Sequence, residues 1–130
     1  MENFSKKYAD VQMLLLSLEK ATNEFEQHEQ TQAHSQALVQ AFSKTFQAFC
    51  DLISEYLTKN HKNFATGKNP HEVISNAHKA GFLAEHDAKI LLQAVKETEK
   101  PVSAEGENPL IHNLETYIET MQTILSEIKP

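Results

Sequence analysis

The stretch from 38 to 57, LVQAFSKTFQAFCDLISEYL, has the clearest pattern of apolar and polar positions in the chain. Its large apolar side chains recur every three or four residues, and polar side chains fill the positions between them. This spacing predicts a helix with one apolar stripe. Since the stripe carries three of the seven phenylalanines, we expect the core to form around it. It comprises Leu38, Phe42, Phe46, Phe49, Ile53, Tyr56 and Leu57.

Three other long segments have the same helical spacing: residues 3–27, 84–99 and 110–128. The first has an apolar stripe of its own, but Met13 and Leu16 lie outside it. This second apolar edge fits either contact with a partner chain or isolated hydrophobic side chains on the surface. The main stripe of the first segment comprises Phe4, Tyr8, Val11, Leu14, Leu15, Leu18 and Phe25.

The sharpest local signal is at residues 69–83, NPHEVISNAHKAGFL. Asn69 is a good N-cap, Pro70 suits the first helical position, and Glu72 stands where a capping box requires an acceptor. Gly81 can adopt the left-handed conformation that ends a helix. The segment therefore predicts a short helix from 70 to 80.

The remaining segments lack apolar periodicity and predict connections. They are residues 27–36, 60–69 and 100–109. Within the first, Ser35 is expected to cap the central helix. At the end of the last, the Asn-Pro pair at 108–109 repeats the cap-plus-proline start.

Together these elements predict an all-α fold in a single domain over residues 1–130. The expected arrangement is an antiparallel up-and-down four-helix bundle with one additional short helix. A chain of 130 residues can bury a core of its own, and only three glycines and four prolines leave few places for turns.

The charge balance argues against a nucleic-acid partner. The net charge is −6, and all 12 basic side chains are lysine, so no arginine is present to grip phosphate. Lys59, Lys62 and Lys68 are the candidates for a local lysine cluster that could still bind phosphate, but they are expected in a solvated loop. The apolar run 13–16 is too short for a signal sequence or a membrane span, and one cysteine permits no internal disulfide, so we predict a cytoplasmic protein with no membrane contact.

No pattern in the chain specifies a reaction. Cys50 lies on the central helix beside Phe46, Phe49 and Ile53, where burial raises the pKa of a thiol and keeps it unreactive. The carboxylates of Glu97, Glu99, Glu105 and Glu107 are expected to be solvated around the last connection. We therefore predict no catalytic residues.

The seven histidines do not have metal-ligand spacing. His71 and His78 are seven residues apart on the short helix, whereas zinc-binding pairs on one helix stand four apart. No Glu-x-x-His pair of a di-iron bundle is present. We predict no metal and no cofactor. His71, Glu72 and His78 are the candidate binding residues, with capping and surface roles as the alternative.

Two segments resemble the nucleotidyltransferase substrate-binding protein family. Residues 42–46, FSKTF, are similar to that family's Phe-Glu-x-Thr-Phe-Glu segment. Residues 69–83 are similar to its Ser-Pro-Arg-Glu-Val-x-x-x-Ala-x-x-x-Gly-Leu-Ile segment. Helix order and length also agree, so the resemblance covers about residues 5–128. The matching positions of the second segment are Pro70, Glu72, Val73, Ala77 and Gly81.

The resemblance implies a HEPN-type bundle, usually dimeric, that binds a small nucleotidyltransferase. Related HEPN ribonucleases cleave RNA with an Arg-x4-His motif, whose two positions fall here on Thr98 and Ser103. Both catalytic groups are missing, so the expected function is that of a non-catalytic binding subunit. Ser43 also replaces the glutamate that usually follows the first phenylalanine. The alternative is a stand-alone dimeric helical interaction protein with no nucleotidyltransferase partner.

Overall fold

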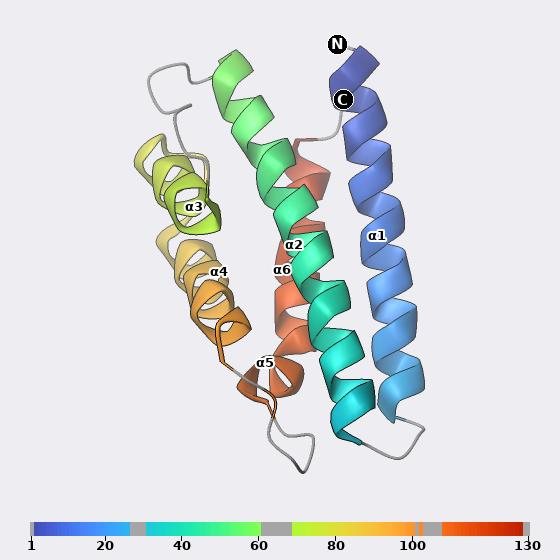
Figure 1. Cartoon of the computed structure of the whole chain (residues 1–130). Helices are drawn as coiled ribbons and strands as arrows, with labels where there is room; N and C mark the ends of the chain where they lie inside the picture. The colour runs from blue at the N-terminus through green and yellow to red at the C-terminus, as the bar shows by residue number, and fades with distance from the viewer. Residues whose placement is uncertain (1, 27–30, 61–68, 101, 103–107, 129–130) are drawn as a thin grey trace.

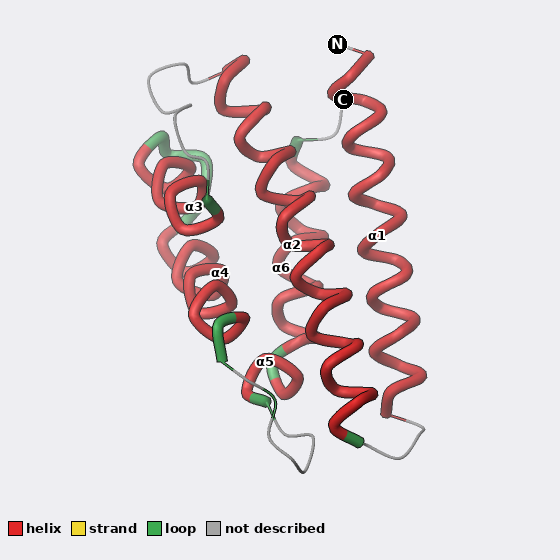
Figure 2. The backbone as a smooth tube through the Cα atoms, viewed as in Figure 1, coloured by secondary structure: helices red, strands yellow, loops and turns green. Residues whose placement is uncertain are grey.

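The structure of the chain is a computed structural model that describes residues 2–26, 31–60, 69–100, 102 and 108–128 (Figure 1). All regular secondary structure within these ranges is helical, which confirms the all-α prediction for them (Figure 2). The helices are α1 (Glu2–Glu26), α2 (Gln32–Asn60), α3 (Pro70–Lys79), α4 (Glu85–Thr98), α5 (Pro109–His112) and α6 (Leu114–Glu127).

The long helix α2 lies at the centre of the arrangement. It runs antiparallel beside α1, while α3 and α4 follow one another along its other side and α6 lies behind it (Figure 1). α6 closes the core by packing against both α1 and α4. α5 lies at one end, in contact with α2, α4 and α6. α1 is therefore an outer helix with contacts to two neighbours, and its far side faces away from the rest of the molecule.

The core forms around the predicted stripe of α2. Phe42, Phe46 and Phe49 are buried, and their rings are stacked with centroid separations of 5.4 Å and 6.5 Å. Tyr56 is only half-buried, at the end of the stripe. Leu52 is fully buried although the stripe did not include it. The apolar face of α2 is thus wider than predicted, because helices pack on it from both sides.

The structure corrects the predicted start of the central helix. α2 begins at Gln32, and Thr31 is its cap: the Thr31 hydroxyl accepts from the backbone N–H of His34 at 3.2 Å. Ser35 lies inside the first turns and is completely buried, so the prediction that it caps the helix is wrong. The helix extends into a polar stretch because Ser35 lies one turn before Leu38 on the inward face.

The predicted caps of α3 are present. The Asn69 side-chain oxygen accepts from the backbone N–H of Glu72 at 2.9 Å, and the Glu72 carboxylate accepts from the Asn69 side-chain amide at 2.8 Å. Gly81 has a φ of 81°. Its N–H donates to the carbonyl of His78 and the N–H of Phe82 donates to that of Ala77, which together form a Schellman motif.

Replacing Gly81 with alanine is expected to lower the free energy of unfolding by about 1 kcal/mol, because a Cβ strains a left-handed backbone. A Cβ at this position would meet no atom within 4 Å, so the cost comes from the backbone alone. Chemical denaturation of the variant measures it. Gly81→Asn should cost less than Gly81→Ala, because asparagine tolerates the left-handed region better. Equal losses would show that backbone conformation is not the cause.

The last predicted helix is divided in two. The segment from 110 to 128 was expected to be continuous, but it breaks at Asn113 between α5 and α6. Asn108 caps α5 as predicted, accepting from the backbone N–H of Leu110 at 2.8 Å. Asn113 turns its side-chain amide toward the carbonyl of Pro109 and the carboxylate of Glu97. These contacts offer the chain an alternative to continuing the helix.

Candidate functional site

The three predicted binding residues all lie on α3, and all three side chains are exposed. Glu72 is engaged with the cap residue Asn69. The Nδ1 atom of His78 lies 3.0 Å from the carbonyl oxygen of Leu83, beyond the end of the helix. Two of the three side chains therefore serve the ends of α3. Their role in binding stays a prediction.

Other sequence-predicted groups are dispersed. Across the described ranges, no group of three or more histidine, cysteine or acidic side chains could hold a metal ion. Lys59 was expected in a loop, but it belongs to the last turn of α2, where it pairs with Glu55 at 3.6 Å and lies over the ring of Phe4. Lys62 and Lys68 lie outside the described residues. Thr98, at the arginine position of the ribonuclease motif, donates its hydroxyl to the carbonyl of Val95, and Ser103 lies outside the described residues.

Cys50 is a buried free thiol, as predicted. Burial raises its pKa far above the ordinary value of 9.0, and the carboxylate of Asp51 adds to the effect. A thiol that holds its proton is a poor nucleophile and a poor metal ligand. Cys50 therefore acts as a small core residue.

A buried carboxylate was missed by the sequence analysis. Glu97 was expected to be solvated, but it lies on the inner side of α4 with 6% of its surface exposed. Its carboxylate accepts a short hydrogen bond from the Tyr117 hydroxyl, two from the Asn113 side-chain amide at 3.3 Å, and one from Gln93 at 3.3 Å. Glu99 is exposed, as predicted, and Glu105 and Glu107 lie outside the described residues. Glu97 lies one turn after Ala94 on the inward face of α4, and this spacing was the sequence signal for its burial.

This cluster is suited to holding helices together. Burial raises the pKa of Tyr117 well above its ordinary value of 10.0, and the Glu97 carboxylate adds to the shift. The phenol therefore stays protonated at neutral pH and acts as a hydrogen-bond donor. Through it, the carboxylate ties α4 to α6 directly behind the break at Asn113. Tyr117 is 1% exposed, so the pair is closed to substrates in solution.

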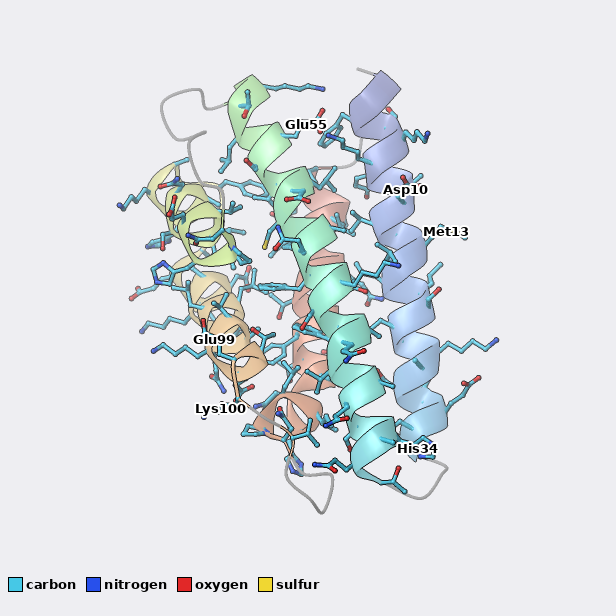
Figure 3. All side chains as sticks on the ribbon, in the orientation of Figure 1. Asp10, Met13, His34, Glu55, Glu99 and Lys100 are labelled. Carbon is cyan, nitrogen blue, oxygen red and sulfur yellow. The ribbon has the colours of Figure 1, made fainter. Side chains whose placement is uncertain are left out.

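The outer surface of α1 is the part of the described chain that departs most from an ordinary solvated surface. Met13 is 66% exposed and Leu16 59%, and they are the exposed large hydrophobic side chains of the described residues. Figure 3 shows Met13 on the outer side of α1, pointing away from the other helices. Single exposed hydrophobic residues are common, but two on one turn form a small apolar ridge.

A groove lies beside this ridge, and a second hollow lies farther along α1. A groove of about 530 Å³ runs between α1 and α6, and no charged side chain lines it. A second hollow of about 240 Å³ lies between α1 and α2. An apolar ridge beside a groove can interdigitate with the side chains of another helix, which makes this surface suited to binding protein. The walls of the groove include Ala9, Gln12 and Leu16 on α1, and Gln122, Leu125 and Ser126 on α6.

Comparison of the chain with protein-family models, curated proteins and solved structures finds no match. None of the helices in the described ranges has the length and apolar content needed to cross a membrane. The choice among functions therefore depends on the surfaces described above and on the resemblance of residues 42–46 and 69–83.

Proposed function

We propose that this protein is a non-catalytic binding subunit that acts through protein–protein contacts and forms a homodimer. The observation that carries the proposal is the exposed pair Met13 and Leu16 on the outer face of α1, beside an uncharged groove. Leaving two large apolar side chains in water forgoes the free energy that their burial would provide, and a partner surface would recover it.

The chemistry of the buried groups supports a role without catalysis. The potential nucleophile Cys50 and the acid–base pair of Glu97 and Tyr117 are both closed to solvent. Burial also raises the pKa of the Cys50 thiol and of the Tyr117 hydroxyl, which makes both groups harder to ionise. A catalytic group needs contact with its substrate and a pKa near the working pH, and Cys50 and Tyr117 have neither.

The class of partner is proposed from the resemblance to the nucleotidyltransferase substrate-binding proteins. On that basis the partner is a small nucleotidyltransferase, and the arrangement of α1, α2, α4 and α6 is an antiparallel up-and-down bundle of the HEPN type. The protein would act in the cytoplasm. The exposed side chains His71, Glu72 and His78 on α3 are the proposed contacts for the partner or its substrate.

The experiment is mass spectrometry of proteins that co-purify with the tagged chain from its native cell, together with light scattering of the pure chain. We expect a small nucleotidyltransferase at stoichiometric level. A tag on an unrelated helical protein of similar charge is the control. Recovery of no nucleotidyltransferase at stoichiometric level, under conditions where the chain itself is abundant, would contradict the assignment of the partner.

The second candidate is a stand-alone dimeric interaction protein. The lack of charge in the groove between α1 and α6 favours it, because such a surface can be buried against another copy of itself without desolvating ionised groups. A stable homodimer that captures no nucleotidyltransferase would select this candidate.

A further inference from the structure

The outer face of α1 carries a line of exposed residues, separate from the buried stripe. Spacings of four and three residues alternate along the pole of the helix that points away from the core, and every residue on this line is exposed. We call these six residues the outer seam. They are Lys6, Asp10, Met13, Ser17, Lys20 and Glu24. Residues at alternating spacings of three and four lie on one face of a helix, so a second helix laid along this face would contact all of them.

We propose that α1 pairs with α1 of a second copy of this chain, in antiparallel orientation, about a two-fold axis that passes midway between Met13 and Ser17. The inference rests on the proposed homodimer and specifies its interface. In a two-fold interface, if residue i of one copy contacts residue j of the other, then residue j of the first copy contacts residue i of the second. Along the outer seam, the residue numbers of two facing positions then add up to 30.

The charges of the outer seam fit this orientation. Antiparallel pairing places Asp10 opposite Lys20 of the other copy and Lys6 opposite Glu24, so all the charges on the seam meet opposite charges. Parallel pairing would place each charge against its own copy, which is repulsive at all four positions. Within the part of the chain that the structure describes, none of the four takes part in an ion pair. By contrast, Lys7, beside the seam, is already paired with Glu55 at 2.8 Å.

The apolar side chains fit it as well. Met13 lies on the seam next to the axis, and Leu14 and Leu16 flank the seam on either side of the same turn. When two copies are related by this axis, the three apolar side chains of each copy meet at the centre of the interface. The charged pairs lie outside them. This is the usual layout of a protein interface, in which a buried apolar centre is surrounded by a polar rim.

The first test measures the dissociation constant of the dimer by sedimentation of the full chain. We expect Asp10→Lys and Lys20→Asp each to weaken the dimer by about tenfold or more, because each change turns two attractive pairs into repulsive ones. The double variant carrying both changes should return toward the native dissociation constant. Lys44→Asp, on the exposed side of α2, is the control matched in net charge to Lys20→Asp and should have no effect.

A second test determines the orientation directly. One preparation carries Asp10→Cys and another Lys20→Cys, and both are treated with a short bismaleimide crosslinker, alone and mixed. We expect crosslinked dimers in the mixture and few in either preparation alone, because sites that are ten residues apart along the helix are separated by about 15 Å. The unaltered chain is the control, since its own Cys50 is 1% exposed.

Each outcome decides the inference. Met13→Glu combined with Leu16→Glu should abolish the dimer while the circular dichroism spectrum stays helical. A dimer that these substitutions leave intact, a monomer at every concentration, or equal crosslinking in the separate preparations would overturn it. Stoichiometric capture of a nucleotidyltransferase by a monomeric chain would overturn the pairing and leave the proposed partner standing. A dimer that responds to the substitutions as expected but captures no such enzyme would support the pairing and contradict the proposed partner.

Discussion

Replacing Phe46 with alanine is expected to lower the free energy of unfolding by about 3–5 kcal/mol, the range typical of a phenylalanine removed from a packed core. The Phe46 side chain is 3% exposed and lies between the rings of Phe42 and Phe49, with centroid separations of 5.4 Å and 6.5 Å. Its loss leaves a cavity in the core, against the middle of α2. Because helices pack on this helix from both sides, the surrounding backbone can close the cavity only in part.

The measurement is denaturation by urea, followed by circular dichroism at several protein concentrations. Lys44→Ala is the matched control: it lies two residues away on the exposed side of the same helix, and we expect a change within about 0.5 kcal/mol. An unfolding curve for Phe46→Ala that hardly differs from that of the native chain would show that the Phe46 ring is not in the core. A loss that grows on dilution would place the ring in an interface between chains.

Replacing Glu97 with alanine is expected to cost about 2–3 kcal/mol, since a buried donor that loses its acceptor keeps its full desolvation penalty. The donor most affected is the Tyr117 hydroxyl, which is closed to water. The side-chain amide of Asn113 also loses two contacts and keeps the one to the carbonyl of Pro109. Thermal and urea denaturation of the purified variant measure the loss. Glu99→Ala, two residues later and exposed, should be close to neutral.

A double-mutant cycle separates the hydrogen bond from general packing. We expect Glu97→Leu combined with Tyr117→Phe to cost less than the sum of the two single changes, because neither partner is then left buried and unsatisfied. Additive losses would mean that the carboxylate and the phenol do not stabilise each other. A single change at Glu97 that costs nothing would place the carboxylate in solvent, as the sequence pattern first suggested.

Hydrophobic periodicity and cap residues predicted most of the fold because both are local. Asn69, Asn108 and Gly81 each act within a few residues of their own position, and each has the predicted role. The errors concern contacts that depend on other helices. Ser35 has the chemistry of a cap residue, but it is drawn inside α2 by its place on the buried face. The break at Asn113 depends in part on Glu97, 16 residues away in sequence.

The candidate site was harder to predict than the fold. A carboxylate such as Glu97 has the same local sequence signature whether it faces solvent or a tyrosine on another helix, and only the packing of α4 against α6 distinguishes the two. Met13 and Leu16 were noticed as a second apolar edge. Their significance depends on the exposure of α1, which a sequence pattern does not specify. The outer seam is defined by its position opposite the buried side of α1, which only the structure establishes.

The hydrogen bond from the Tyr8 hydroxyl to the carbonyl of Leu125, 2.7 Å long, joins residues 117 positions apart in the chain. Contacts between α1 and α2 form across a short connection, whereas contacts between α1 and α6 require nearly the whole chain to be in place. Closing a longer loop costs more entropy, so long-range contacts of this kind form late in folding. We therefore expect the pair of α1 and α2 to assemble early and the contact with α6 to form last. We also expect the folded molecule to open first along the groove at that contact.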